Sequence, residues 1–279
     1  MWTKKALLLI GLLAVAAGIG AAEDPPPPSG VVGLPLIGEE AVRFLRAAEV
    51  IDTPENFDSK AITDPVRVTV SDGTRTLRAI FKDENTLYPR FRFGDGREVD
   101  RVRDTYKHEI AAYELDTMLG LGLVPPCVER ELFSRMGSLC LWVENAVTEA
   151  ERGRRGLHPP DVEQWNRRMI LVRFFHQLIW DLDYANIRNL LVDSNFQIFK
   201  IDSSMAFHPD GELRRENSLN RFSRDALEAL ESLERGDLEK RLGPWLLKKE
   251  IRALWTRRDR LLELARDRVE RHGETQVLY

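Results

Sequence analysis

The residues best suited to chemistry lie in two short stretches in the second half of the chain. Residues 180–192 read W-D-L-D-Y-A-N-I-R-N-L-L-V, and residues 199–207 read F-K-I-D-S-S-M-A-F. Together they predict a loop with acidic and amide side chains, a hydrophobic hairpin, and then an aspartate at a strand end. Phosphoryl transfer needs these groups, because one carboxylate orients the attacking hydroxyl while an Asn and a second Asp hold metal at the phosphates. The alternative is a polar turn between two buried strands, in which Asp and Asn serve only turn formation.

Two upstream residues add groups that phosphoryl transfer uses. Lys82 ends a predicted strand over residues 77–82, from which its ammonium can project toward bound phosphates, although any single lysine at a strand end is more commonly a surface residue. Glu109 lies in the first turn of a predicted helix, where the helix dipole alone also favours a carboxylate. Taken in order, strand lysine, helix glutamate, loop Asp and Asn, and strand-end Asp follow the layout of kinases.

The predicted helix and the hairpin after it carry a more specific resemblance. Residues 107–116 read K-H-E-I-A-A-Y-E-L-D, and residues 124–130 read V-P-P-C-V-E-R. These strings resemble the four-jointed-type secretory-pathway kinases and bacterial proteins related to them, and the layout is remotely similar to HipA-type and phosphoinositide kinases. The resemblance covers most of the chain from about residue 66 onward. It implies an α+β, two-lobed kinase-like fold, with a small antiparallel sheet and one helix in the N-lobe and a mainly helical C-lobe.

The resemblance also implies roles for individual residues. Lys82 would contact the nucleotide phosphates, and Glu109 would pair with that lysine or help to bind metal. Asp183 would be the catalytic base. Asp202 would bind the metal that bridges the phosphates, with Asn189 as a further metal ligand. The implied ligands are ATP with Mg²⁺ or Mn²⁺, together with a protein or carbohydrate that accepts the phosphate.

The loop departs from the family pattern, which is roughly D-R-x-x-x-N. Tyr184 follows Asp183 where the family has Arg, and Asn189 lies six positions after Asp183 instead of five. Asp181 and Asn186 have the five-position spacing, but this pairing misaligns the strand that follows. Either the loop contains a one-residue insertion or the roles have moved to Asp181 and Asn186, which are therefore alternate candidates. The register matters because a misplacement of about 1 Å can cost roughly a hundredfold in rate.

Two functions of different classes follow from these residues. The first is an ATP- and metal-dependent kinase, which the presence of all the expected charged groups favours. The second is a pseudokinase, a nucleotide- or protein-binding module without turnover, which the departures in the loop favour. A metal-dependent hydrolase built on Asp181, Asp183 and Asp202 has the ligands but lacks a supporting histidine cluster, since the five histidines are scattered singly.

The N-terminal residues predict export. Residues 1–22 begin with the basic stretch M-W-T-K-K, continue with an apolar run and end with small residues, as in a secretory signal peptide. The alternative is an uncleaved single span that anchors the protein to a membrane. Residues 23–38, with four consecutive prolines, predict an extended linker. We therefore expect a periplasmic or secreted protein, with an N-lobe over residues 39–146 and a C-lobe over residues 147–279.

Charge and periodicity give the remaining expectations. The net charge is −4, and basic residues are interspersed with acidic ones, which gives no support for nucleic-acid binding. Residues 83–103 predict a loop whose arginines either are solvated or contact an anionic substrate. The predicted elements are helices at 39–48, 105–119, 161–180, 219–234 and 245–271, strands at 66–70 and 77–82, and hairpins at 124–143 and 190–201.

The chain has two cysteines, Cys127 and Cys140, which flank a turn predicted at residues 134–137. Counted outward from that turn, the two cysteines do not lie opposite each other. The pattern therefore favours two buried thiols over a disulfide, although an exported protein could form one.

Overall fold

The computed structural model describes residues 31–53, 65–92, 96 and 98–279. The predicted signal peptide, residues 1–22, and the proline run lie outside the described residues. Within the described ranges, no helix has the length and apolar character needed to cross a membrane. Residues 31–36 lie against the N-terminal lobe, where Gly33 and Glu144 exchange two backbone hydrogen bonds of 2.9 and 2.7 Å.

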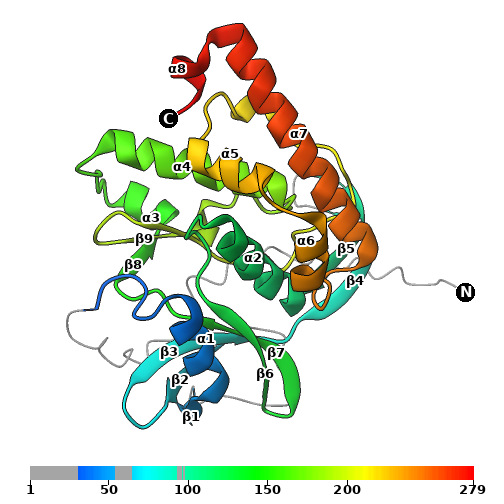
Figure 1. Cartoon of the computed structure of the whole chain (residues 1–279). Helices are drawn as coiled ribbons and strands as arrows, with labels where there is room; N and C mark the ends of the chain where they lie inside the picture. Colours follow the sequence, from blue (N-terminus) through cyan, green and yellow to red (C-terminus); the bar gives the residue numbers. More distant parts are fainter. Residues whose placement is uncertain (1–30, 54–64, 93–95, 97) are drawn as a thin grey trace, which may run out of the picture.

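The N-terminal lobe is a five-stranded antiparallel sheet with a helix packed against it (Figure 1). The strand order is β1 (Glu49–Asp52), β2 (Val66–Ser71), β3 (Thr76–Lys82), β7 (Arg135–Leu141), β6 (Cys127–Leu132). Val66, Val68 and Val70 are buried on alternate positions of β2, as expected for a strand with one face on a core. Helix α1 (Gly38–Ala47) packs Phe44 and Leu45 into the same cluster. The predicted helix at 39–48 and the strands at 66–70 and 77–82 are confirmed.

The predicted loop at 83–103 is wrong, because this segment is a β-hairpin. Strand β4 (Asn85–Arg92) pairs antiparallel with β5 (Glu98–Thr105). Most residues of β4 are exposed on both faces, so the sequence lacks the apolar alternation that indicates a strand. In β5, Val102 is buried in a small cluster with Trp180 and Leu182.

Helix α2 (Tyr106–Leu119) connects the two lobes, as the prediction at 105–119 expected. Thr105 caps its start by accepting a hydrogen bond from the Lys107 amide at 3.3 Å. Gly120 ends it with the left-handed conformation, φ 63°, that a glycine adopts at low cost. The helix contacts β6 and β7 on one side and α5 (Arg224–Glu231) and α6 (Arg235–Leu242) on the other (Figure 1).

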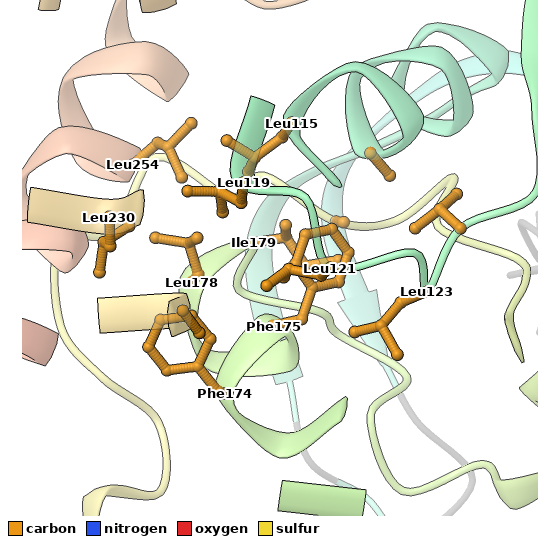
Figure 2. Packing of buried hydrophobic residues seen from close by; sticks show 14 of the residues in the cluster. Leu115, Leu119, Leu121, Leu123, Phe174, Phe175, Leu178, Ile179, Leu230 and Leu254 are labelled. Carbon is orange, nitrogen blue, oxygen red and sulfur yellow. The ribbon is translucent and has the colours of Figure 1, made fainter. Parts of the chain in front are cut away.

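The C-terminal lobe is mainly helical and contains a three-stranded sheet. The sheet order is β10 (Ile198–Lys200), β9 (Leu190–Asp193), β8 (Ala146–Thr148). Besides α5 and α6, its helices are α3 (Glu149–Arg154), α4 (Val162–Leu178), α7 (Lys248–His272) and α8 (Glu274–Val277), with one-turn 3₁₀ helices at Ile187–Asn189 and Glu216–Ser218. Figure 2 shows Leu115 and Leu119 of α2 in one apolar cluster with Leu178 of α4, Leu230 of α5 and Leu254 of α7.

The predicted C-terminal helices are confirmed with one change of extent. The predictions at 161–180 and 245–271 correspond to α4 and α7, and the hairpin predicted at 190–201 is β9–β10. The prediction at 219–234 is too long, since α5 starts only after Ser223, whose side chain accepts a hydrogen bond from the Ala226 amide at 3.3 Å. Helix α5 ends at Glu231, and the short helix α6 begins at Arg235, just beyond the predicted range.

The expectation of two free thiols is also wrong, because Cys127 and Cys140 form a disulfide. The β6–β7 hairpin turns at Phe133 and Ser134, with φ of 55° and 59°, and not at residues 134–137. From this earlier turn, Cys127 and Cys140 are directly opposite each other, with their Cα atoms 4.0 Å apart. The turn was missed because two-residue turns with positive φ usually contain Gly or Asn, whereas this one contains Phe-Ser.

Candidate functional site

The central feature of the site is an ion-pair cluster around Lys82 at the end of β3. Its Nζ atom lies 2.6 Å from Oε1 of Glu109 on α2 and 2.9 Å from Oδ1 of Asp202, which follows β10. Burial alone would lower the pKa of Lys82, but the two carboxylates, Asp202 and then Glu109, outweigh burial and raise it. The lysine is therefore charged, and residues predicted separately from three elements meet at one point.

Helix α2 is fixed to the segment after Asp202 by hydrogen bonds as well as by charge. The second oxygen of Glu109 accepts a hydrogen bond from the Ser203 amide at 3.0 Å. The Ser204 carbonyl accepts one from the Thr105 amide at 3.0 Å, and His108 Nδ1 donates to the same oxygen at 2.8 Å. Glu109 is therefore held in place while it pairs with Lys82.

Asp202 presents a carboxylate to the site from an uncommon backbone conformation. Its φ of 59° lies in the left-handed region, and its side chain is 45% exposed. The ammonium of Lys82 lowers the pKa of Asp202, against the opposing effect of burial. The carboxylate is ionised, as a metal ligand must be.

Asp183 lies in the loop between α4 and β9 and is held by two amides. Its Oδ2 atom accepts hydrogen bonds from Asn186 Nδ2 at 2.8 Å and Asn189 Nδ2 at 2.9 Å. Burial raises the pKa of Asp183, the Asn186 hydrogen bond opposes this shift, and the charges of Asp181 and Asp202 add to it. Asn186 and Asn189, which the sequence spacing did not distinguish, therefore contact the same carboxylate.

Asp181 lies behind the site, not at its surface. Its side chain is 2% exposed, and Oδ2 lies 3.1 Å from Nζ of Lys200, the fully buried last residue of β10. Its Oδ1 accepts a hydrogen bond from the Asp183 amide at 3.0 Å. His176 Nε2 is 3.5 Å from the same carboxylate, but burial lowers the pKa of His176 to about 4, so this imidazole is neutral near pH 7.

The side-chain oxygen atoms near Asp202 are of the kind that ligates a hard divalent cation. The backbone of Asn189 lies next to the segment before Asp202, since the main-chain carbonyl of Asn189 accepts a hydrogen bond from the Ile201 amide at 2.9 Å. Carboxylate and amide oxygens suit Mg²⁺ and Mn²⁺. Among the described residues, no three His, Cys, Asp or Glu side chains converge on one point. Mg²⁺ sites at phosphates usually have few protein ligands and are completed by phosphate oxygens and water, so these residues fit such a cation together with a nucleotide.

Sequence reasoning missed two charged residues that border the site. Lys200 was hidden in an apolar stretch, and a charged residue in a buried strand is the one signal that could have identified it. Asp104 lies between the predicted loop, which ended at residue 103, and the predicted helix, which began at residue 105. Burial raises its pKa to about 6, a hydrogen bond with Ser204 opposes this shift, and the charges of Glu84 and Asp202 add to it.

Comparison with known proteins tests the fold. No protein-family model matches the chain, and no curated protein matches it. The solved structure of Fam20 from hydra, determined with sugar, aligns with a TM-score of 0.60 and 15% identity, over 85% of this chain and 90% of that chain. The chain has a kinase-like fold. The Helicobacter pylori proinflammatory kinase CtkA aligns with a TM-score of 0.49 and 11% identity, over 80% of this chain and 97% of that chain. The alignment with Fam20 confirms the α+β, two-lobed kinase-like fold and, at the level of the fold, the remote resemblance to four-jointed-type kinases.

Proposed function

We propose that this protein is an exported, ATP- and metal-dependent kinase that transfers phosphate to a hydroxyl group of a protein or carbohydrate acceptor. The observation that carries the proposal is the position of Lys82, which binds Glu109 and Asp202 at 2.6 and 2.9 Å. Asp183 lies in the adjoining loop with its carboxylate held by two amides. On a kinase-like fold, this is the set of groups that phosphoryl transfer requires.

Each residue has a distinct part in the proposed reaction. Lys82, kept charged by its two carboxylate partners, would bind phosphate oxygens, and Asp202 with Asn189 would hold the divalent cation. ATP is the proposed phosphoryl donor, and the divalent cation would supply charge neutralisation at its phosphates. Asp183 orients the acceptor hydroxyl and takes its proton as the acceptor oxygen bonds to phosphorus and ADP leaves. Its raised pKa suits it to accept a proton, because a stronger conjugate base takes protons more readily.

Two observations support export. Residues 1–22 have the composition of a signal peptide. The disulfide between Cys127 and Cys140 suits an oxidising compartment, where such bonds form and persist. If the N-terminal segment is retained instead of cleaved, the same proposal places the enzyme on a membrane.

A pseudokinase is the second candidate, and two observations favour it. Both Asn186 and Asn189 donate to the same oxygen of Asp183, and Tyr184 occupies the position where related kinases have Arg. Such a protein would bind nucleotide through Lys82 and Asp202 without transferring phosphate.

An assay of phosphate transfer and ATP hydrolysis distinguishes the kinase from the pseudokinase. The purified protein is incubated with ATP labelled at the γ-phosphate and Mn²⁺ or Mg²⁺, with candidate protein and carbohydrate acceptors. Metal-dependent transfer or slow hydrolysis that is lost in Asp183→Asn, while nucleotide binding is kept, supports the enzyme. Nucleotide binding with no turnover in either protein supports the pseudokinase and overturns the enzyme.

A further inference from the structure

Lys200 is a buried cation that the proposed reaction does not use. It is the last residue of β10, and its side chain is completely buried. Burying an ammonium costs several kcal/mol unless the group is paired and hydrogen-bonded. An apolar residue would fill the same place in the strand without this cost. The contacts of Lys200 therefore indicate what its charge does.

The ammonium of Lys200 holds the backbone on both sides of Asp202. It donates to the carbonyl oxygens of Ile201 at 2.7 Å and Asp202 at 2.9 Å, and to Oγ of Ser203 at 3.3 Å. The first carbonyl belongs to the peptide plane that sets φ of Asp202, and the second to the plane that sets ψ. Asp202 has φ 59°, a conformation that costs a non-glycine residue about 1–3 kcal/mol unless its surroundings enforce it. Lys200 supplies that enforcement.

Lys200 is also connected to the loop that carries Asp183. Its Nζ lies 3.1 Å from Oδ2 of Asp181, and Oδ1 of Asp181 accepts the Asp183 amide at 3.0 Å. The three protons of Lys200 are directed at the oxygens of residues 201–203, so its contact with Asp181 is chiefly electrostatic. One continuous chain of contacts therefore runs from the backbone of Asp202, through Lys200 and Asp181, to the backbone of Asp183.

We propose that Lys200 and Asp181 are positioning residues that set the placement of the base Asp183 relative to the metal ligand Asp202. Neither residue touches substrate, because both are buried. This inference rests on the proposed function for its catalytic consequence. Its structural part, the restraint of two loops by one buried pair, is independent of that function and can be measured separately.

The test compares the wild type with the double variant Lys200→Met/Asp181→Asn. With Asp181→Asn, the amide oxygen can still accept the Asp183 amide. The double variant additionally removes the ammonium, and its neutral partner avoids an unpaired buried carboxylate. Asp116→Asn is the matched control, because Asp116 is also buried and accepts a backbone amide, that of Leu123, but does not belong to the contact chain.

The first readout is amide hydrogen exchange in the unliganded protein. We expect exchange in residues 201–204 and 181–189 to rise at least about tenfold in the double variant relative to the wild type, because local opening becomes easier there. Asp116→Asn should leave these amides unchanged. Equal exchange in the double variant and the wild type would overturn the inference. If the double variant does not fold, Lys200→Gln/Asp181→Asn keeps a neutral donor in the same place and permits the same comparison.

The second readout is function. In the double variant we expect the Mn²⁺-dependent affinity for ATP to fall. We also expect kcat for phosphate transfer or ATP hydrolysis to drop by about a hundredfold, as a displacement near 1 Å would cause. The Asp116→Asn variant should match the wild type in both measurements. Unchanged affinity and kcat would refute the positioning role while the proposed function stands. If the wild type binds no nucleotide but the double variant exchanges its amides faster, the proposed function is refuted and the structural restraint is supported.

Discussion

Replacing Lys82 by methionine should lower the stability of the folded protein as well as change the candidate nucleotide site. Glu109 is 7% exposed on its side chain, and Lys82 is 16% exposed, so their contact at 2.6 Å is nearly buried. Removing one partner of a buried ion pair leaves an uncompensated charge and costs about 3–5 kcal/mol. The Asp202 contact adds little to this cost, because that carboxylate is 45% exposed and water screens it.

The lower end of that range applies here, because Glu109 keeps the hydrogen bond from the Ser203 amide when Lys82 is lost. We expect a loss of about 3 kcal/mol, which for a domain of this size lowers the melting temperature by about 6–12 °C. The double variant Lys82→Met/Glu109→Gln removes the unpaired charge and should recover most of the loss.

Thermal unfolding of the wild type, Lys82→Met and the double variant, without nucleotide and at one pH, measures this effect. A melting temperature of Lys82→Met equal to or above that of the wild type would refute the reasoning. So would a double variant no more stable than the single one, since relief of the Glu109 charge is the reason for recovery.

Three other predictions follow from individual residues. Asp183→Asn should keep nucleotide binding and lower turnover by about 10²–10⁴-fold. Because the pKa of Asp183 is raised, a pH–rate profile of the wild type should show turnover falling with decreasing pH already above the ordinary Asp pKa of 3.8. Asp116, which accepts the Leu123 amide, has its pKa raised by burial to about 6, so the folded state takes up a proton before the unfolded state does as pH falls. Stability relative to Asp116→Asn should therefore increase by up to about 3 kcal/mol from pH 7 to pH 4, measured by urea unfolding, and an unchanged difference would contradict the shift. Replacing both Cys127 and Cys140 by alanine should cost about 3 kcal/mol, because the disulfide closes a short loop in the unfolded chain, and equal stability of the reduced and oxidised wild type would contradict this.

The sequence predicted the groups of the site because each has a local signal. Lys82 ends an apolar strand, Glu109 begins an apolar helix, and Asp202 follows a buried hairpin. Their convergence within hydrogen-bonding distance could be expected only through resemblance to a known layout, since no local pattern encodes a contact between β3 and the segment after β10.

What the sequence could not predict depends on contacts between distant residues. Spacing left the choice between Asp181 and Asp183 open, and the burial of Asp181 against Lys200 depends on how two loops pack. The hairpin β4–β5 is exposed on both faces for much of its length, so it lacks the periodic apolar pattern that identifies strands. The pairing of Cys127 with Cys140 was hidden by a turn without glycine or asparagine.

The central claim is that Lys82 and Asp202 form a nucleotide–metal site, and a thermal-shift titration tests it most directly. The wild type and Asp202→Ala are titrated with ATP and other nucleotides, with and without Mn²⁺ or Mg²⁺. A ligand at a hundredfold excess over its dissociation constant stabilises the folded state by about 2.7 kcal/mol. We predict a metal-dependent rise in melting temperature with ATP that Asp202→Ala loses, while its unliganded melting temperature stays near that of the wild type. No shift with any nucleotide, or an equal shift in Asp202→Ala, would contradict the claim.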